Sequence, residues 1–176
     1  MLIQLTSENA FFQKLKAQWE GECSQFGESL ADYAAPQLEH AEKIANEATV
    51  DQGYGVFALR SSDGSYDCLM HVNRARLPST TGETLRIVWI LIAPRFDFSE
   101  ISVSEFARLA SGVIHGAIGH SDTGNPTKHV KIHLSGMGDR EFFTGVALGL
   151  QENSAFETVA VRGNWLHITK ALHALA

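Results

Sequence analysis

The sequence predicts an α+β domain, and three observations lead to this expectation. Up to Gly53, one short apolar stretch is followed by apolar residues that recur with the spacing of helices. From Tyr54 the spacing changes to the alternation of extended chain, and a long apolar strand at Leu85–Ala93 then leads into a second helical part. Because 176 residues suit one core of ordinary size, we expect residues 1–176 to form a single domain.

The amino-terminal elements are predicted from apolar spacing and from residues that break helices. Leu2–Thr6 fits a short strand. Ser7 then opens a helix that ends near Gly27, and its apolar residues repeat every four positions: Phe11, Leu15 and Trp19. A second helical region follows from Ser29 to Gly53 and is broken or restarted at Pro36.

The middle of the chain predicts three strands. Tyr54–Arg60 and Tyr66–Arg76 form a hairpin in this interpretation, because apolar residues of the second strand alternate with polar ones such as Asp67. The next strand, Leu85–Ala93, is apolar on both faces apart from Arg86. This pattern is typical of a central strand that is covered on two sides.

The last part of the chain predicts two helices and three strands. The capping-box spacing of Ser102 and Glu105 starts a helix that reaches about Ile118, and Asp139 caps another that reaches Leu150. The strands are a central one between the helices and a closing hairpin that turns at Gly163 and Asn164: His129–Ser135, Phe156–Arg162 and Trp165–Lys170.

The composition argues against several classes of protein. The formal net charge of −6 is unsuited to a nucleic-acid surface, because neutralising phosphates requires clustered lysine and arginine. No segment approaches the roughly 18 uninterrupted apolar residues of a membrane helix, and Met1–Thr6 lacks the basic start and apolar core of a signal peptide. We expect a soluble, cytoplasmic protein in which Cys23 and Cys68 are reduced.

The histidines do not have the spacing of metal ligands. His129 and His133 are four residues apart on a predicted strand, so they lie about 13 Å apart along one face. His115 and His120 are five residues apart around the end of a helix. Since neither pair is placed to chelate, we predict no metal site.

The order of elements over essentially the whole chain resembles the GNAT (Gcn5-related N-acetyltransferase) superfamily. This resemblance implies a GNAT-like mixed, mostly antiparallel sheet flanked by helices. It also implies an acyl-donor cleft between the strands at Leu85–Ala93 and His129–Ser135. The residues that the resemblance places at the donor are Ile92, Ala93 and Ser135.

The joint between Leu85–Ala93 and the following helix departs from the superfamily pattern. That pattern is Arg or Gln, two residues, Gly, any residue, and Gly or Ala, and its bare amides hold the pyrophosphate of the cofactor. Here no glycine occurs between Pro94 and Phe106, and the joint carries Asp97, Glu100 and Glu105. We expect Ser102 and nearby carboxylates to cap the helix, so that coenzyme A binds weakly or not at all.

A narrower resemblance concerns acyl-homoserine-lactone (autoinducer) synthases. Arg-Leu-Pro-Ser-Thr-Thr-Gly at 76–82, Trp89 and Arg95-Phe96 are similar to the Arg-Leu-Leu-Pro-Thr-Thr-Gly and Trp-Glu-x-Ser-Arg-Phe blocks of that family. Those enzymes take the acyl chain from acyl carrier protein, whose pantetheine arm brings no adenosine diphosphate. The match covers few residues, and Ile92 stands at the place of the family's glutamate. It implies that Arg76 and Trp89 contact the substrate.

Candidate catalytic residues lie near the ends of the two central strands. His133 is a candidate general base, and a hydrogen-bonded core histidine is the alternative. Arg95 ends the long apolar strand and is the second candidate. Arg76 has the strand parity of buried residues and would then need an acidic partner or a ligand, whereas a solvated arginine at a strand end is the alternative. The resemblance places Phe143 where many relatives have a tyrosine that protonates the leaving thiolate.

Two functions follow from these observations. The first is an acyltransferase-like protein that moves an acyl group from a pantetheine-type donor, acyl carrier protein or acyl-CoA, to a small amine. The second is a catalytically inactive domain of the same fold that binds a small ligand or a protein partner, since the phosphate cradle and the tyrosine are both missing.

Overall fold

A computed structural model describes residues 1–47, 53–78 and 80–171. It divides into two compact units, Met1–His71 with Ile90–Gly116 and Val72–Trp89 with Ala117–Ala176. This division does not test the expectation of a single domain, which stays a prediction. Ser79 of the motif at 76–82 lies outside the described residues.

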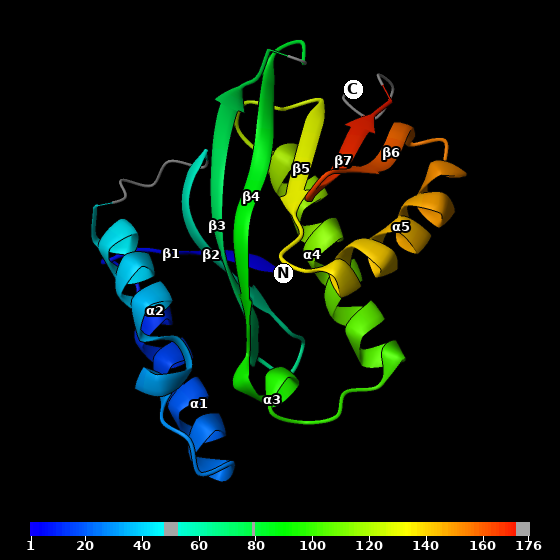
Figure 1. The fold of residues 1–176 in the computed structure, drawn as a ribbon. Coiled ribbons are helices and arrows are strands. Elements are labelled where there is room, and N and C mark those ends of the chain that lie inside the picture. The colour runs from blue at the N-terminus through cyan, green and yellow to red at the C-terminus, as the bar shows by residue number, and fades with distance from the viewer. Residues whose placement is uncertain (48–52, 79, 172–176) are drawn as a thin grey trace. The chain divides into compact units, whose positions relative to one another are not determined.

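The first unit contains the amino-terminal elements, which Figure 1 colours from blue to green. Parts of β3, β4 and α4 belong to it as well. The elements are β1 (Leu2–Leu5), α1 (Phe11–Gln25), α2 (Leu30–Glu47), β2 (Tyr54–Arg60), β3 (Tyr66–Arg76), β4 (Glu83–Ile92), α3 (Pro94–Asp97) and α4 (Val103–Ser121).

The second unit contains the remaining parts of β3, β4 and α4 and all later elements. These are β5 (His129–His133), α5 (Met137–Gln151), β6 (Phe156–Arg162) and β7 (Trp165–Lys170). The strands are hydrogen-bonded in the order β1-β2-β3-β4-β5-β7-β6. Antiparallel pairs are β1 with β2 and β7 with both β5 and β6, whereas β4 and β5 are parallel. The predicted α+β class and the predicted order of helices and strands are confirmed, with α3 as an additional short helix.

The core of the first unit forms where α1 packs on the strands. Its buried stripe is Phe12, Leu15, Trp19 and Cys23, so the helix is rotated slightly from the predicted stripe, and Phe11 is only half-buried. Trp19 is fully buried, and its indole N–H donates to the Tyr66 carbonyl oxygen at 3.1 Å. α2 is broken at Ala34, where φ is −154°, two residues before Pro36. This break agrees with the predicted interruption.

Two glycines let α4 approach the first strands closely. A Cβ atom on Gly116 would lie 2.7 Å from Cγ of Leu2, and one on Gly112 would lie 3.0 Å from Cδ2 of Leu59. The first distance is shorter than carbon atoms tolerate and the second is tight, so a larger residue at either position would require the leucine side chain or the helix to shift.

The sheet of the second unit is amphipathic. One face carries aliphatic residues that are at most 5% exposed: Leu85, Ile87, Val130, Ile132, Val159, Leu166 and Ile168. The opposite face carries basic, imidazole and indole side chains that are half-buried or exposed. The strict alternation agrees with the strand period of two.

The predicted central strand is corrected in its second half. β4 pairs with β5 from Thr84–His129 to Ile87–Ile132, and it then runs on to Ile92. The prediction that the strand is buried on both faces is wrong beyond Ile87, because Val88–Ile92 are all half-buried. The apolar side chains of Val88–Ile92 are therefore partly accessible to solvent, although β4 is the fourth of seven strands in the sheet order.

We expect His167 to make the stability of the protein dependent on pH. Burial, followed by repulsion from Lys131 and Arg162, lowers the pKa of His167 to about 4. In the unfolded chain the ring takes up a proton near pH 6.5, so stability that is complete above pH 6.5 is lost as the pH falls towards 4. With an allowance for solvent screening, we expect a loss of about 1–2 kcal/mol.

Urea unfolding of His167→Gln and of the unchanged protein at several pH values between 7 and 4 checks this prediction. The variant should lose less stability over this range, because glutamine has no ring to protonate. Parallel pH profiles for the two proteins would contradict the assignment.

Candidate functional site

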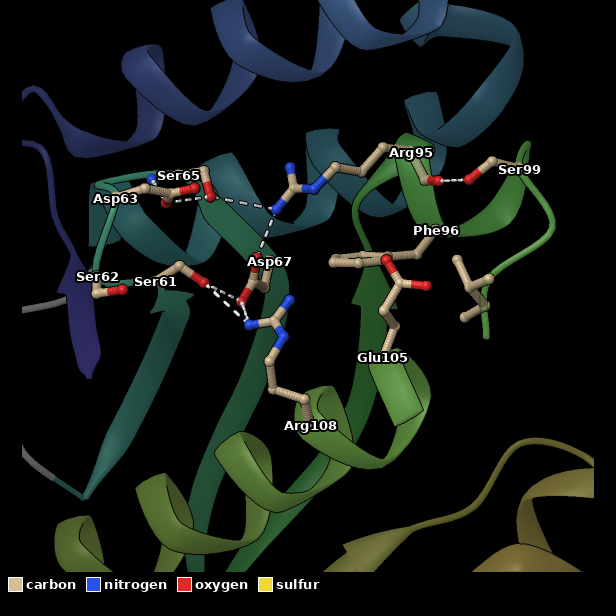
Figure 2. A pocket seen from close by; sticks show the side chains of 11 residues that line it. Ser61, Ser62, Asp63, Ser65, Asp67, Arg95, Phe96, Ser99, Glu105 and Arg108 are labelled. Carbon is tan, nitrogen blue, oxygen red and sulfur yellow. Dashed lines mark hydrogen bonds and ion pairs between the residues drawn. The ribbon is translucent and has the colours of Figure 1, made fainter. Parts of the chain in front are cut away.

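A polar pocket of about 470 Å³ lies in the first unit (Figure 2). The turn after β2, the start of β3, α3 and the first turns of α4 form its walls. Serines line it together with two basic and three acidic residues: Arg95, Arg108, Asp63, Asp67 and Glu105. The pocket therefore combines hydroxyl groups with charges of both signs.

Asp67 is the most buried charged group of the pocket. Its side chain is 3% exposed and accepts hydrogen bonds from Arg95, from Ser61 and, at 3.4 Å, from Arg108. Its carbonyl oxygen accepts the backbone N–H of Ala93 at 2.9 Å. The prediction that Asp67 lies on a polar strand face is wrong, because all residues of Tyr66–Met70 are buried. A carboxylate there requires the cations that surround it.

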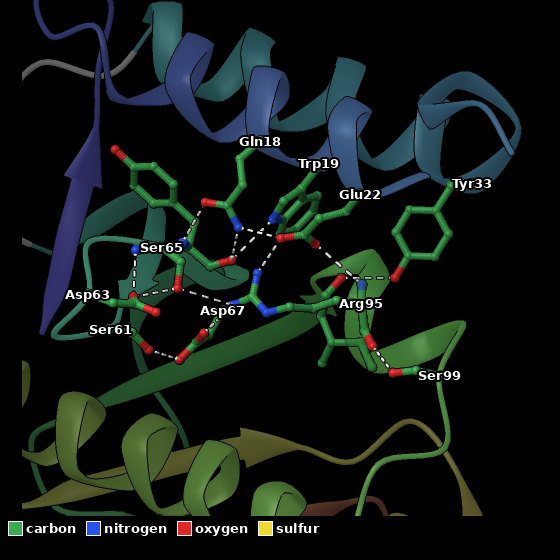
Figure 3. A network of polar contacts seen from close by, with 12 residues as sticks. Gln18, Trp19, Glu22, Tyr33, Ser61, Asp63, Ser65, Asp67, Arg95 and Ser99 are labelled. Atoms are coloured by element: carbon green, nitrogen blue, oxygen red, sulfur yellow. Dashed lines mark hydrogen bonds and ion pairs between the residues drawn. The ribbon is translucent and has the colours of Figure 1, made fainter. Parts of the chain in front are cut away.

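Arg95 joins this carboxylate to α1 (Figure 3). Pro94 occupies the first position of α3, where its fixed φ suits the start of a helix, and Arg95 follows it. The guanidinium pairs with Glu22 and Asp67 and donates to Ser65 Oγ at 3.3 Å. The Arg95 backbone N–H also donates to Glu22 at 3.3 Å. Arg95 is therefore held by carboxylates on two sides.

The charges of the pocket sum to a negative value. Its three carboxylates face two guanidinium groups, and Glu22 behind Arg95 adds a fourth carboxylate. Hydrogen bonds from the backbone and side chain of Ser65 lower the pKa of Asp63. Bonds from Ser102 likewise lower the pKa of Glu105. Because both carboxylates stay ionised, the pocket favours a ligand that carries a positive charge.

Side chains of Ser102 and Glu105 cap the backbone amides at the start of α4, as predicted. The Ser102 hydroxyl accepts the Glu105 backbone N–H at 3.2 Å, and Glu105 accepts the Ser102 backbone N–H at 2.9 Å. The hydroxyl also donates to the same carboxylate at 2.7 Å. This capping box places a carboxylate where a diphosphate would have to bind.

Two predicted cofactor-binding residues lie at the end of β4. The carbonyl oxygen of Ile92 accepts the hydroxyl of Tyr33 at 2.9 Å, and its side chain is half-buried. Ala93 is fully buried, and its N–H is bonded to Asp67. Ile92 therefore offers side-chain surface to a ligand, while Ala93 positions Arg95 and Asp67.

The other predicted residues belong to the second unit. The His133 ring contacts the Trp165 ring edge-on, with centroids 4.9 Å apart. Trp89 is half-buried in β4. Arg76 is exposed, so the alternative of a solvated arginine holds, and its expected position on the covered side is wrong.

Ser135 is exposed, and its backbone N–H donates to Asp139 Oδ2 at 3.0 Å. The predicted cap at Asp139 is corrected by this contact. α5 begins at Met137 after Gly136, and Asp139 reaches back from its third residue to the amides of Ser135 and Gly136. The carboxylate caps the helix from inside its first turn.

Sequence reasoning found Arg95 but missed its partners. Asp67 could have been found, because an acid inside an apolar strand requires a cation, and Arg95 was already a candidate. Glu22 and Arg108 stand on helices without any distinguishing motif. Only the folded chain brings them to Arg95 and Asp67.

Within residues 1–47, 53–78 and 80–171, no group of His, Cys, Asp and Glu is arranged to hold a metal ion. In the same part of the chain, no helix combines the length and the apolar character that spanning a membrane requires.

Several solved structures are similar to this chain. One, from Corynebacterium glutamicum, is described as histone acetyltransferase HPA2 and related acetyltransferase. It is 11% identical in sequence, the match covers 98% of this chain and 97% of that chain, and the TM-score is 0.45. Another is a tetramutant of the BH1408 protein of Bacillus halodurans, with 12% identity, coverage of 93% and 99%, and a TM-score of 0.38. No protein-family model and no curated protein matches the chain. Similarity at this level says nothing of ligand or reaction.

Proposed function

We propose that this chain is an acyltransferase-like protein that moves an acyl group from a pantetheine-type donor to a small amine. The observation that carries the proposal is the half-buried apolar stretch Val88–Ile92, which follows the paired part of a parallel strand. Five consecutive apolar side chains at such a place favour an apolar ligand, because central strands otherwise bury them. An acyl chain or a pantetheine arm has the extended, mainly apolar shape that suits a strand.

The polar pocket supports a small amine as the acceptor. The end of the apolar stretch, Ile90–Ile92, belongs to the first unit, as the pocket does. Ala93, directly after it, donates its backbone N–H to the carbonyl oxygen of Asp67 in the pocket. An ammonium group would be attracted by the excess of carboxylates, while the two arginines can hold an acidic part of the same molecule.

The donor in this proposal lacks a diphosphate. The Ser102–Glu105 capping box occupies the amides that a pyrophosphate would use, and Glu105 repels it. Acyl carrier protein, which the partial resemblance to autoinducer synthases implies, presents its pantetheine without that group. In this scheme, Arg76 and Trp89 stay candidate substrate contacts, His133 and Arg95 candidate catalytic residues, and Ile92, Ala93 and Ser135 candidate donor contacts.

Coenzyme A is expected to bind with a dissociation constant no better than about 1 mM, a free energy of about −4.1 kcal/mol. Titration calorimetry at low salt, where charge effects are largest, measures this value. The double variant Ser102→Gly, Glu105→Gln opens the helix start and removes the repelling charge. It should bind coenzyme A about tenfold more tightly. Micromolar binding to the unchanged protein would contradict our interpretation of the helix start.

Release of thiol from acyl carrier protein, acyl-pantetheine and acyl-CoA, with and without a panel of small amines, tests the proposed reaction. Amine-dependent release from the first two donors is expected. Ile90→Asp should reduce it by at least about 100-fold, because a carboxylate beside an acyl chain is strongly unfavourable. Leu148→Asp, at a 71% exposed position of α5, is the matched control and should keep the activity. Equal losses in both variants would contradict a role for the stretch.

A second candidate function is ligand binding without catalysis. The observation that favours it is Phe143, which is 6% exposed and has no hydroxyl to protonate a leaving thiolate. A ligand at 100 times its dissociation constant adds about 2.7 kcal/mol of stability. A thermal shift with acyl-pantetheine in the absence of any turnover would support this candidate over the first.

A further inference from the structure

The second unit carries basic side chains on the face of its sheet opposite the aliphatic one, where Arg162 is exposed and the others are half-buried. The register aligns Arg86 of β4, Lys131 of β5 and His167 of β7, and in the next row it aligns Trp165 of β7 with Arg162 of β6. Partners in register lie on one face of a sheet. We call these five residues the basic face.

The cations of the basic face have no acidic partners among the described residues. The ion pairs within that part of the chain leave out Arg86, Lys131 and Arg162. Burial and repulsion from the two arginines lower the pKa of Lys131. In a chain whose formal net charge is −6, such a concentration of uncompensated positive charge is a feature to explain.

Aromatic contacts hold part of this surface in place. The Arg86 guanidinium lies over the Trp165 ring, 5.2 Å from its centroid, and His133 contacts the same ring from its edge. An arginine stacked on an indole has less conformational freedom to lose on binding. Tryptophan and arginine are also the residues that contribute most at protein interfaces.

The layout of the charges fits an extended ligand. The basic residues span four strands, β4, β5, β7 and β6, which are three spacings of about 4.8 Å, or about 14 Å. One phosphate group contacts donors within about 3 Å and engages only a small part of this surface. A row of carboxylates on another protein matches its length, and an apolar residue of that protein can pack on Trp165.

We propose that the basic face docks an acidic protein surface, whose carboxylates pair with Arg86, Lys131 and Arg162 around Trp165. The proposal rests on charge and register in the second unit and does not depend on acyl transfer. Association should be fast and strongly weakened by salt, because electrostatic attraction between the two surfaces steers their encounter.

Titration of the full chain with poly-L-glutamate tests the proposal, with the amide spectrum as readout. Binding at low ionic strength should shift the amides of β5 and β7 around Lys131, Trp165 and His167. Lys131→Glu with Arg162→Glu should weaken binding at least about tenfold. Lys14→Glu with Lys43→Glu changes the net charge equally at exposed sites on the other unit, and it should change binding less than about twofold.

Four results would overturn the proposal. The first two are equal weakening of poly-L-glutamate binding in both double variants and shifts of amide signals outside β4, β5, β6 and β7. The third is tighter binding of a single-stranded oligonucleotide at the same amides. The fourth is a concentration-dependent dimer that the Lys131→Glu, Arg162→Glu variant abolishes. The last two would identify a nucleic acid or a second copy as the occupant. Both double variants must keep the circular dichroism spectrum of the unchanged protein, and Lys131→Gln with Arg162→Gln replaces the reversal variant if it does not.

Discussion

Replacing Asp67 by alanine is expected to lower the free energy of unfolding by about 3–5 kcal/mol, the cost of removing one partner of a buried ion pair. The Asp67 side chain is 3% exposed and accepts hydrogen bonds from Arg95, Arg108 and Ser61. Its loss leaves the Arg95 guanidinium, which is 28% exposed, with Glu22 as its remaining acidic partner. Urea unfolding at neutral pH measures the difference.

The control for this prediction removes a weaker partner of the same carboxylate. Arg108 is 56% exposed and lies 3.4 Å from Asp67, so Arg108→Ala should cost less than about 1 kcal/mol. If both variants lose the same stability, Asp67 does not organise the network. A loss near zero for Asp67→Ala would show that the pair is not formed in solution.

Replacing Trp19 by alanine is expected to cost about 3–5 kcal/mol for the lost packing, plus about 1 kcal/mol for the hydrogen bond. Trp19 is fully buried, and its indole donates to the Tyr66 carbonyl oxygen at 3.1 Å. That carbonyl precedes Asp67, so the indole fixes the backbone at the start of β3. Thermal and urea unfolding of Trp19→Ala measure the effect.

Two variants separate the causes of this loss. Trp19→Phe keeps much of the packing but has no N–H, so it should lose less stability than alanine does. Phe11→Ala, on the same helix at a half-buried position, should cost less than about 2 kcal/mol. If Phe11→Ala lost as much stability as Trp19→Ala, our assignment of the Trp19 side of α1 to the core of the first unit would be wrong.

Local patterns of the sequence predicted the elements whose formation depends on neighbouring residues. The Ser102–Glu105 box is an interaction over three residues, and it forms as expected at the start of α4. The turn from strand to strand after Arg60 and the closing hairpin at Gly163 also follow from short-range chemistry. Gly163 has a φ of 59°, which suits glycine in such a turn.

The parts that failed depend on contacts between distant residues. Burial of Asp67 was missed because its cations come from positions 28 and 41 residues further along the chain. The apolar pattern of Val88–Ile92 predicted full burial, because it contains no sign that the pairing with β5 ends at Ile87. α3 was missed because one turn of four residues is too short to show a period.

The position of β7 has a consequence for synthesis of the chain. β7 follows β6 in the sequence, yet it lies between β5 and β6 and pairs with both. While the ribosome still holds Trp165–Lys170, β5 and β6 each present an unpaired edge, and unpaired edges invite association with other chains. The second unit therefore closes its sheet only after Trp165–Lys170 have left the ribosome. Any truncation before Trp165 would make that exposed state permanent.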